Sequence, residues 1–87
     1  MIKAYLNIQT TGKGTNNNFY AVQSPVSFKN DKELFFYLKD YYIHKPIGSL
    51  QQFKGYITAY KDVSRTQPFM KVYFEYGKVK SQTIYGR

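Results

Sequence analysis

The sequence predicts a small α+β domain in which one helix packs on one face of an antiparallel sheet. Several segments alternate between apolar and polar residues, as half-buried strands do, and one segment spaces its apolar residues as a helix does. The 87 residues include ten tyrosines and seven phenylalanines but no cysteine, so a core of apolar side chains must hold the fold together. We expect residues 1–87 to form one basic domain of order β-β-α-β-β, with a candidate fifth strand at the end.

The first two strands are expected over residues 2–9 and 19–24. A segment rich in glycine, threonine and asparagine, residues 10–18, reads as the hairpin loop between them. Pro25 ends the second strand because proline has no N–H to donate to a neighbouring strand. The first strand has the clearest alternation, with one face formed by Ile2, Ala4, Leu6 and Ile8.

One helix is expected over roughly residues 31–44. Asn30 is suited to cap it, and Glu33, three residues later, completes a capping box. His44 falls in the last turn, where a positive charge suits the helix dipole, and Pro46 ends the segment. The apolar side of the helix is predicted to consist of Leu34, Phe35, Leu38, Tyr41 and Tyr42.

The remaining residues are expected to be strands again. Residues 53–61 and 69–76 are separated by a polar loop over 62–68. Gly77 breaks the second of these strands, and residues 78–85 alternate as the candidate fifth strand. All three strands belong to the predicted sheet.

Three of the expected strands share one pattern. Successive residues of a strand point to opposite faces, so residues 2–9, 53–61 and 69–76 each place apolar side chains on one face. The helix can cover only that face, which leaves the other to water or to a partner. The lysines and tyrosines of the uncovered face are Lys3, Tyr5, Lys54, Tyr56, Tyr60, Lys71 and Tyr73.

The net charge of +8, from thirteen Lys and Arg against five Asp and Glu, favours polyanionic partners. Eleven of the thirteen cations are lysines, which contact phosphates without reading the bases as arginine does. The same charge would also serve as a solubility surface or reflect the codon bias of an AT-rich genome.

An exposed sheet with tyrosines among lysines can bind single strands, since bases stack on rings and ammonium groups contact phosphates. The sequence therefore predicts a protein that binds single-stranded DNA or RNA with low sequence specificity. Lys13, in the first loop, joins the seven residues above as a candidate contact. Small size and composition suggest a phage or mobile-element origin.

Other interpretations of the same face remain open. It could be a plain sheet surface. It could also be the protein-binding face of an inhibitor or adaptor, which offers its basic surface to an acidic surface of a host factor, such as a nucleic-acid enzyme, and blocks that factor. Homodimerisation through the tyrosines is compatible with either partner. The start of the third strand, Lys54-Gly55-Tyr56, resembles the opening of the RNA-recognition-motif signature. Ile57 and Thr58 then depart from that signature, so the chain is not assigned to the family.

The sequence gives no support for an enzyme or a cofactor site. Lys13 follows Gly12, but the spacing of a phosphate-binding P-loop is absent. His44, the single histidine, is explained by its place in the last turn of the helix, and no catalytic motif surrounds it in the sequence. The five carboxylates lack metal-ligand spacing. We expect a non-enzyme without metal. No long apolar run indicates a signal peptide or membrane span, so a cytoplasmic location without membrane contact is expected.

Overall fold

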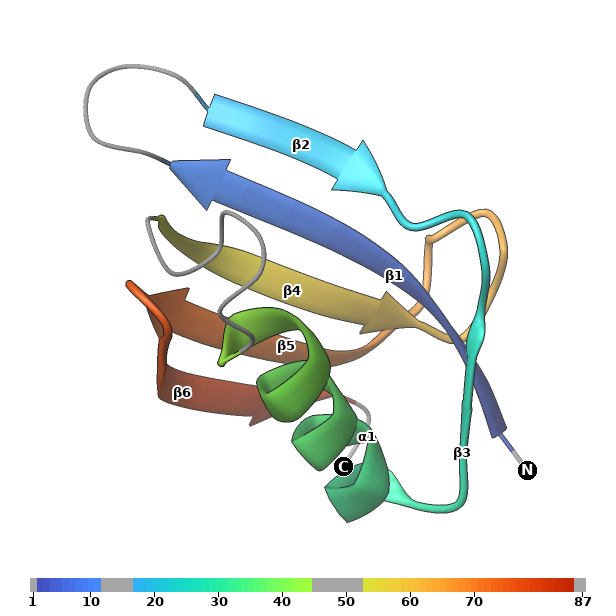
Figure 1. Cartoon of the computed structure of the whole chain (residues 1–87). Helices are drawn as coiled ribbons and strands as arrows, with labels where there is room; N and C mark the ends of the chain where they lie inside the picture. The colour runs from blue at the N-terminus through green and yellow to red at the C-terminus, as the bar shows by residue number, and fades with distance from the viewer. Residues whose placement is uncertain (1, 12–16, 45–52, 86–87) are drawn as a thin grey trace.

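The computed structural model describes residues 2–11, 17–44 and 53–85. Within these residues an antiparallel sheet carries a helix on one face, which confirms the predicted α+β class (Figure 1). The strands lie in the order β2-β1-β4-β5-β6, and a short strand, β3, also pairs with β1. Their bounds are β1 (Ile2–Thr11), β2 (Asn17–Ala21), β3 (Val26–Phe28), β4 (Lys54–Tyr60), β5 (Pro68–Glu75) and β6 (Lys78–Ile84).

Two short strands share one edge of β1. Its second half pairs with β2, and its first half pairs with β3. The sequence predicted one strand over 19–24 here, and this was wrong beyond Ala21. Val22 still donates its N–H to the Leu6 carbonyl at 2.9 Å, after which Pro25 interrupts the pairing because it has no N–H. The chain then rejoins β1 at Val26.

The candidate fifth strand is present as β6, and it forms one edge of the described sheet. A tight turn joins it to β5. Tyr76 and Gly77 both have positive φ, 50° and 84°, as the two central residues of a type I′ hairpin turn require.

The helix begins where the sequence predicts. It consists of α1 (Asp31–Tyr37) followed directly by a π-helical segment, η1 (Leu38–Ile43). The Asn30 side chain accepts the Glu33 N–H at 2.9 Å. Glu33 in turn accepts the N–H of Lys29 at 3.2 Å, one residue earlier than in a standard capping box.

The π-helical segment changes which side chains face the sheet. His44 donates its N–H to the carbonyl of Lys39, five residues earlier, at 2.8 Å. The wider turn places Ile43 in the core after Leu38, whereas Tyr41 is 49% exposed. The prediction that Tyr41 belongs to the apolar side was therefore wrong, because it assumed an unbroken α-helical period. Of the described helices, none is long and apolar enough to cross a bilayer.

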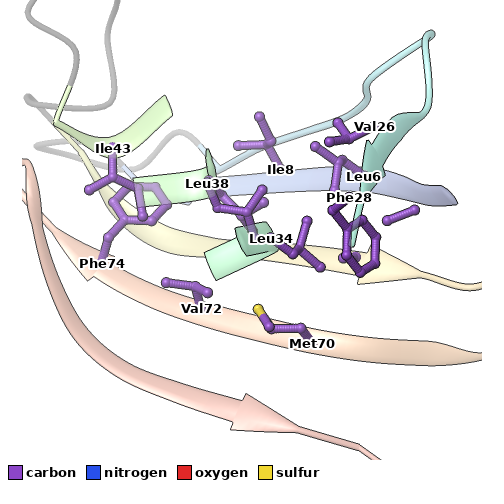
Figure 2. Close-up of a cluster of buried hydrophobic side chains, with 13 residues drawn as sticks. Leu6, Ile8, Val26, Phe28, Leu34, Leu38, Ile43, Met70, Val72 and Phe74 are labelled. Carbon is purple, nitrogen blue, oxygen red and sulfur yellow. The ribbon is translucent and has the colours of Figure 1, made fainter. Parts of the chain in front are cut away.

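The core lies between the helix and one face of the sheet (Figure 2). Burial alternates along β4 and, from Phe69 onward, along β5, which places every second residue under the helix. Leu34 and Leu38 of the helix pack over these strands (Figure 2). The sheet contributes Ala4, Leu6, Ile8, Val26, Phe28, Ile57, Ala59, Met70, Val72 and Phe74 to this core.

The loop between β4 and β5 is held to a distant part of the chain by Arg65. Its guanidinium donates to the carbonyl of Val22 and to that of Val63, both at 2.9 Å. Asp62 closes the same loop by accepting the hydroxyl of Thr66 at 2.6 Å, and this bond, with backbone N–H donors, lowers the pKa of Asp62. The loop is therefore an ordered connection.

Candidate functional site

The sheet face opposite the helix is called the open face here. The core members Ile57 and Val72 point toward the helix, so their neighbours in β4 and β5 point away from it. This geometry brings most of the predicted site residues onto one surface. Over the paired stretches of β1, β4 and β5, the open face consists of Tyr5, Asn7, Gln9, Thr11, Lys54, Tyr56, Thr58, Tyr60, Lys71, Tyr73 and Glu75, of which Asn7 is buried.

Two tyrosines form a pair near the middle of the open face. Tyr56 and Tyr73 are direct partners across β4 and β5, and their ring centroids lie 5.0 Å apart with an interplanar angle of 43°. The Nζ atom of Lys71 lies 4.2 Å from the centroid of the Tyr56 ring, which is a cation–π contact. Both rings are partly exposed, so an aromatic surface and an ammonium group meet the solvent side by side.

A carboxylate lies on the other side of this pair. The Tyr73 hydroxyl donates to Oε2 of Glu75 at 2.6 Å. This hydrogen bond, together with desolvation and the negative charge of Glu75, raises the pKa of Tyr73 to about 12. The phenol therefore keeps its proton at neutral pH. Glu75 also lies between two lysines, since its partners across the sheet are Lys54 on β4 and Lys78 on β6.

A second pair of tyrosines lies at the other end of the open face. Tyr5 and Tyr60 are partners across β1 and β4. The guanidinium carbon of Arg65 lies 5.9 Å from the ring centroid of Tyr5, so an arginine accompanies this pair. Tyr60 is four residues from Tyr56 along β4, which corresponds to about 13 Å at the rise of a strand.

Besides Lys71, which contacts Tyr56, three lysines belong to the predicted site: Lys3, Lys13 and Lys54. Lys54 is exposed and precedes Tyr56 by two residues on the same face of β4. Lys3 pairs with Ser27 on β3, and at the rise of a strand it is about 20 Å along β1 from the partner of Tyr56. The structure therefore does not bring Lys3 to the central pair. Lys13 lies outside the described residues.

Comparisons of the chain with models of protein families, with curated proteins and with solved structures found no match. The chemistry of the open face is therefore the basis for a functional proposal.

The predicted site omitted three residues that the structure places beside it. Phe19 on β2 is 66% exposed and lies opposite Gln9, which in turn lies opposite Tyr56. Arg65 and Glu75 contact tyrosines of the open face directly. The place of Glu75 could be predicted from the alternation along β5. The place of Phe19 depends on the register between β1 and β2, and that of Arg65 depends on its long-range contact with Tyr5, so neither could be predicted from local sequence.

A hollow of about 480 Å³ lies elsewhere, between the helix and the segment that joins β2 to β3. Its described lining includes Tyr37, Tyr41 and Tyr42, and neither Lys nor Arg is among those lining residues. The rings of Tyr37 and Tyr41 stack with centroids 5.1 Å apart. Across the described ranges, no three His, Asp or Glu residues group to hold a metal ion.

Proposed function

We propose that this protein binds single-stranded nucleic acid with low sequence specificity, through its open face. The observation that carries the proposal is the Tyr56–Tyr73 pair with the Lys71 ammonium beside it, on a sheet face that the helix leaves uncovered. The protein would act by occupying the strand, without catalysis.

The ring pair supplies a surface on which bases can stack. Stacking of one base on one aromatic side chain contributes about 1–3 kcal/mol and tolerates any base. Lys71 now lies against Tyr56, but its four-carbon stem is flexible, so the ammonium can move to a phosphate while a base occupies the ring. The two groups therefore complement the two halves of a nucleotide.

The charge of the molecule supports the same partner. With a net charge of +8, the protein attracts polyanions over distances longer than any single contact. The cations on and beside the open face are mainly lysines, including the exposed Lys54 and Lys78. Lysines hold phosphates as point charges and do not form the paired hydrogen bonds by which arginine reads guanine in a duplex. Weak sequence preference follows for most positions of a bound strand.

Affinity for an oligonucleotide is expected to fall steeply with salt, because each lysine–phosphate contact releases a counterion. Fluorescence anisotropy of a labelled strand of about eight nucleotides, as DNA and as RNA, measures this at about 50 and 200 mM salt. The log–log slope should correspond to several contacts, and a duplex of equal length should bind more weakly because its bases cannot stack on the rings. Equal affinity at both salt concentrations would exclude phosphate contacts.

Replacing Tyr56 by alanine should weaken single-strand binding by about 1–3 kcal/mol while the fold survives, since the ring is outside the core. Tyr56→Phe should change binding little, because stacking uses the ring and not the hydroxyl. Tyr41→Ala is the matched control: it removes an exposed tyrosine from the helix and should leave affinity unchanged. Titration of each variant with the labelled strand measures the change in affinity, and a thermal melt shows whether the fold survives. If Tyr56→Ala binds as tightly as the parent, stacking on this ring is disproved.

The rival function is a protein-binding inhibitor or adaptor that presents its basic surface to an acidic site. It would show the same salt dependence, but with a protein as the partner. If neither DNA nor RNA binds at the lower salt concentration, the rival becomes the better explanation of the charge. Homodimerisation through the open face would compete with binding of nucleic acid to the same face. Sedimentation with and without the oligonucleotide therefore distinguishes a homodimer from a nucleic-acid complex.

A further inference from the structure

We propose that Glu75 makes guanine the preferred base on the Tyr56–Tyr73 pair. The inference rests on the proposed function and names the base that the same site takes. It concerns only this central position of the open face, whereas the rest of a bound strand would be held without regard to sequence.

The ring pair has opposite charges on its two sides along β5. Lys71, Tyr73 and Glu75 are alternate residues of that strand, so each lies about 7 Å from the next on the open face. The ammonium of Lys71 lies over the ring of Tyr56, 4.2 Å from its centroid, and the carboxylate of Glu75 lies at the hydroxyl of Tyr73. A nucleotide stacked on the rings is therefore oriented with its phosphate toward Lys71 and the polar edge of its base toward Glu75.

An ionised carboxylate only accepts hydrogen bonds, through two neighbouring oxygens. Guanine presents two neighbouring donors on its pairing edge, the ring N1–H and the exocyclic N2–H. Adenine and cytosine present one amino group beside a bare ring nitrogen, whose lone pair the carboxylate repels. Thymine and uracil present one N–H between two carbonyl oxygens. Of the common bases, guanine alone offers both oxygens of Glu75 a donor.

The carboxylate is held in place before any base arrives. Tyr73 donates to its Oε2 atom at 2.6 Å, and this bond fixes the orientation of the carboxylate. An oxygen of a carboxylate has more than one lone pair, so Oε2 can accept from a base as well. A fixed acceptor loses less entropy on binding than a free side chain does. Lys54 and Lys78, on the flanking strands, offset the repulsion between Glu75 and a nearby phosphate.

The test uses thymidine strands of about eight nucleotides that differ at one central position, which is guanine, hypoxanthine or thymine. Hypoxanthine keeps N1–H but lacks the amino group at position 2, so it is the matched probe for the second hydrogen bond. The protein should bind the guanine strand about tenfold more tightly than the thymine strand, with the hypoxanthine strand between them. The preference should disappear in Glu75→Gln, which should bind the thymine strand at least as tightly as the parent because a negative charge is lost. Asp40→Asn, an exposed carboxylate on the helix, is the control variant and should keep the preference.

The outcomes separate this inference from the proposed function. If the parent binds all three strands with equal affinity, the guanine preference is disproved and single-strand binding stands. If Glu75→Gln keeps the preference, guanine is selected by another residue and the role of Glu75 is disproved. If no strand binds the parent at low salt, the proposed function fails, and the inference fails with it.

Discussion

Replacing Gly55 by alanine is expected to destabilise the domain by more than about 3 kcal/mol, because the new methyl group would collide with backbone that cannot move aside. A Cβ at this position would meet the carbonyl oxygen of Gln9 and would lie 2.9 Å from the Cα atom of Thr10. Both atoms belong to β1, the strand that pairs with β4 at this point. Relief would require the two central strands to separate, and the hydrogen bonds between them would be lost.

Chemical denaturation of the parent and of Gly55→Ala measures the difference in the free energy of unfolding. Thr58→Ala is the matched control, since it changes the same strand on the open face and removes no core contact. The control should differ from the parent by no more than about 1 kcal/mol. Equal stability of Gly55→Ala and the parent would show that β1 and β4 are not packed as closely as described.

Leu38→Ala is expected to cost about 2–5 kcal/mol, because it opens a cavity at the centre of the core. Leu38 is fully buried and begins the π-helical segment, where the helix faces the sheet (Figure 2). Since small domains are stable by only about 5–15 kcal/mol, this one variant is expected to remove a large part of that stability. Leu38→Met keeps the volume and should cost less than about 1.5 kcal/mol.

A thermal melt followed by circular dichroism measures both Leu38 variants. Phe36→Ala is the control on the same helix, since Phe36 is exposed and outside the core. A melting temperature of Leu38→Ala within a degree or two of the parent would show that another face of the helix contacts the sheet.

The fold class and most element positions could be predicted from the sequence because they follow from local patterns. Asn30 and Glu33 mark the start of the helix through a hydrogen bond between residues three apart, and the structure contains that bond. Alternation placed Ile57 and Val72 in the core and Tyr56 and Tyr73 opposite them, as the structure has it. Two-residue periodicity is a property of the strand itself, so it needs no knowledge of the neighbouring strands.

Features that depend on departures from a regular period could not be predicted. Ile43 replaces Tyr41 in the core because the helix changes from an α to a π turn after Tyr37, and no residue type marks that change. The strand β3 was missed because it has three residues, too few to show alternation.

The candidate site was predictable in its composition but not in its arrangement. The sequence assigned Tyr56 and Tyr73 to one face, yet only the register between β4 and β5 makes them direct partners. The contact of Arg65 with Val22 spans 43 residues and has no local signature. The distance between Lys3 and the central pair likewise depends on the register between β1 and β4, which places Gln9, six residues after Lys3, opposite Tyr56.

Along β4 and β5, alternate residues either form the core or form the surface of the open face, and this makes the domain a usable scaffold for protein engineering. Tyr56, Thr58, Lys71 and Tyr73 lie outside the core, while the residues between them form it. A combinatorial library at these four positions would vary the chemistry of a continuous surface on two adjacent strands. Gly55 and the core residues between the four varied positions would be kept unchanged to retain the fold. Ligands unrelated to the natural partner could then be selected on the same frame.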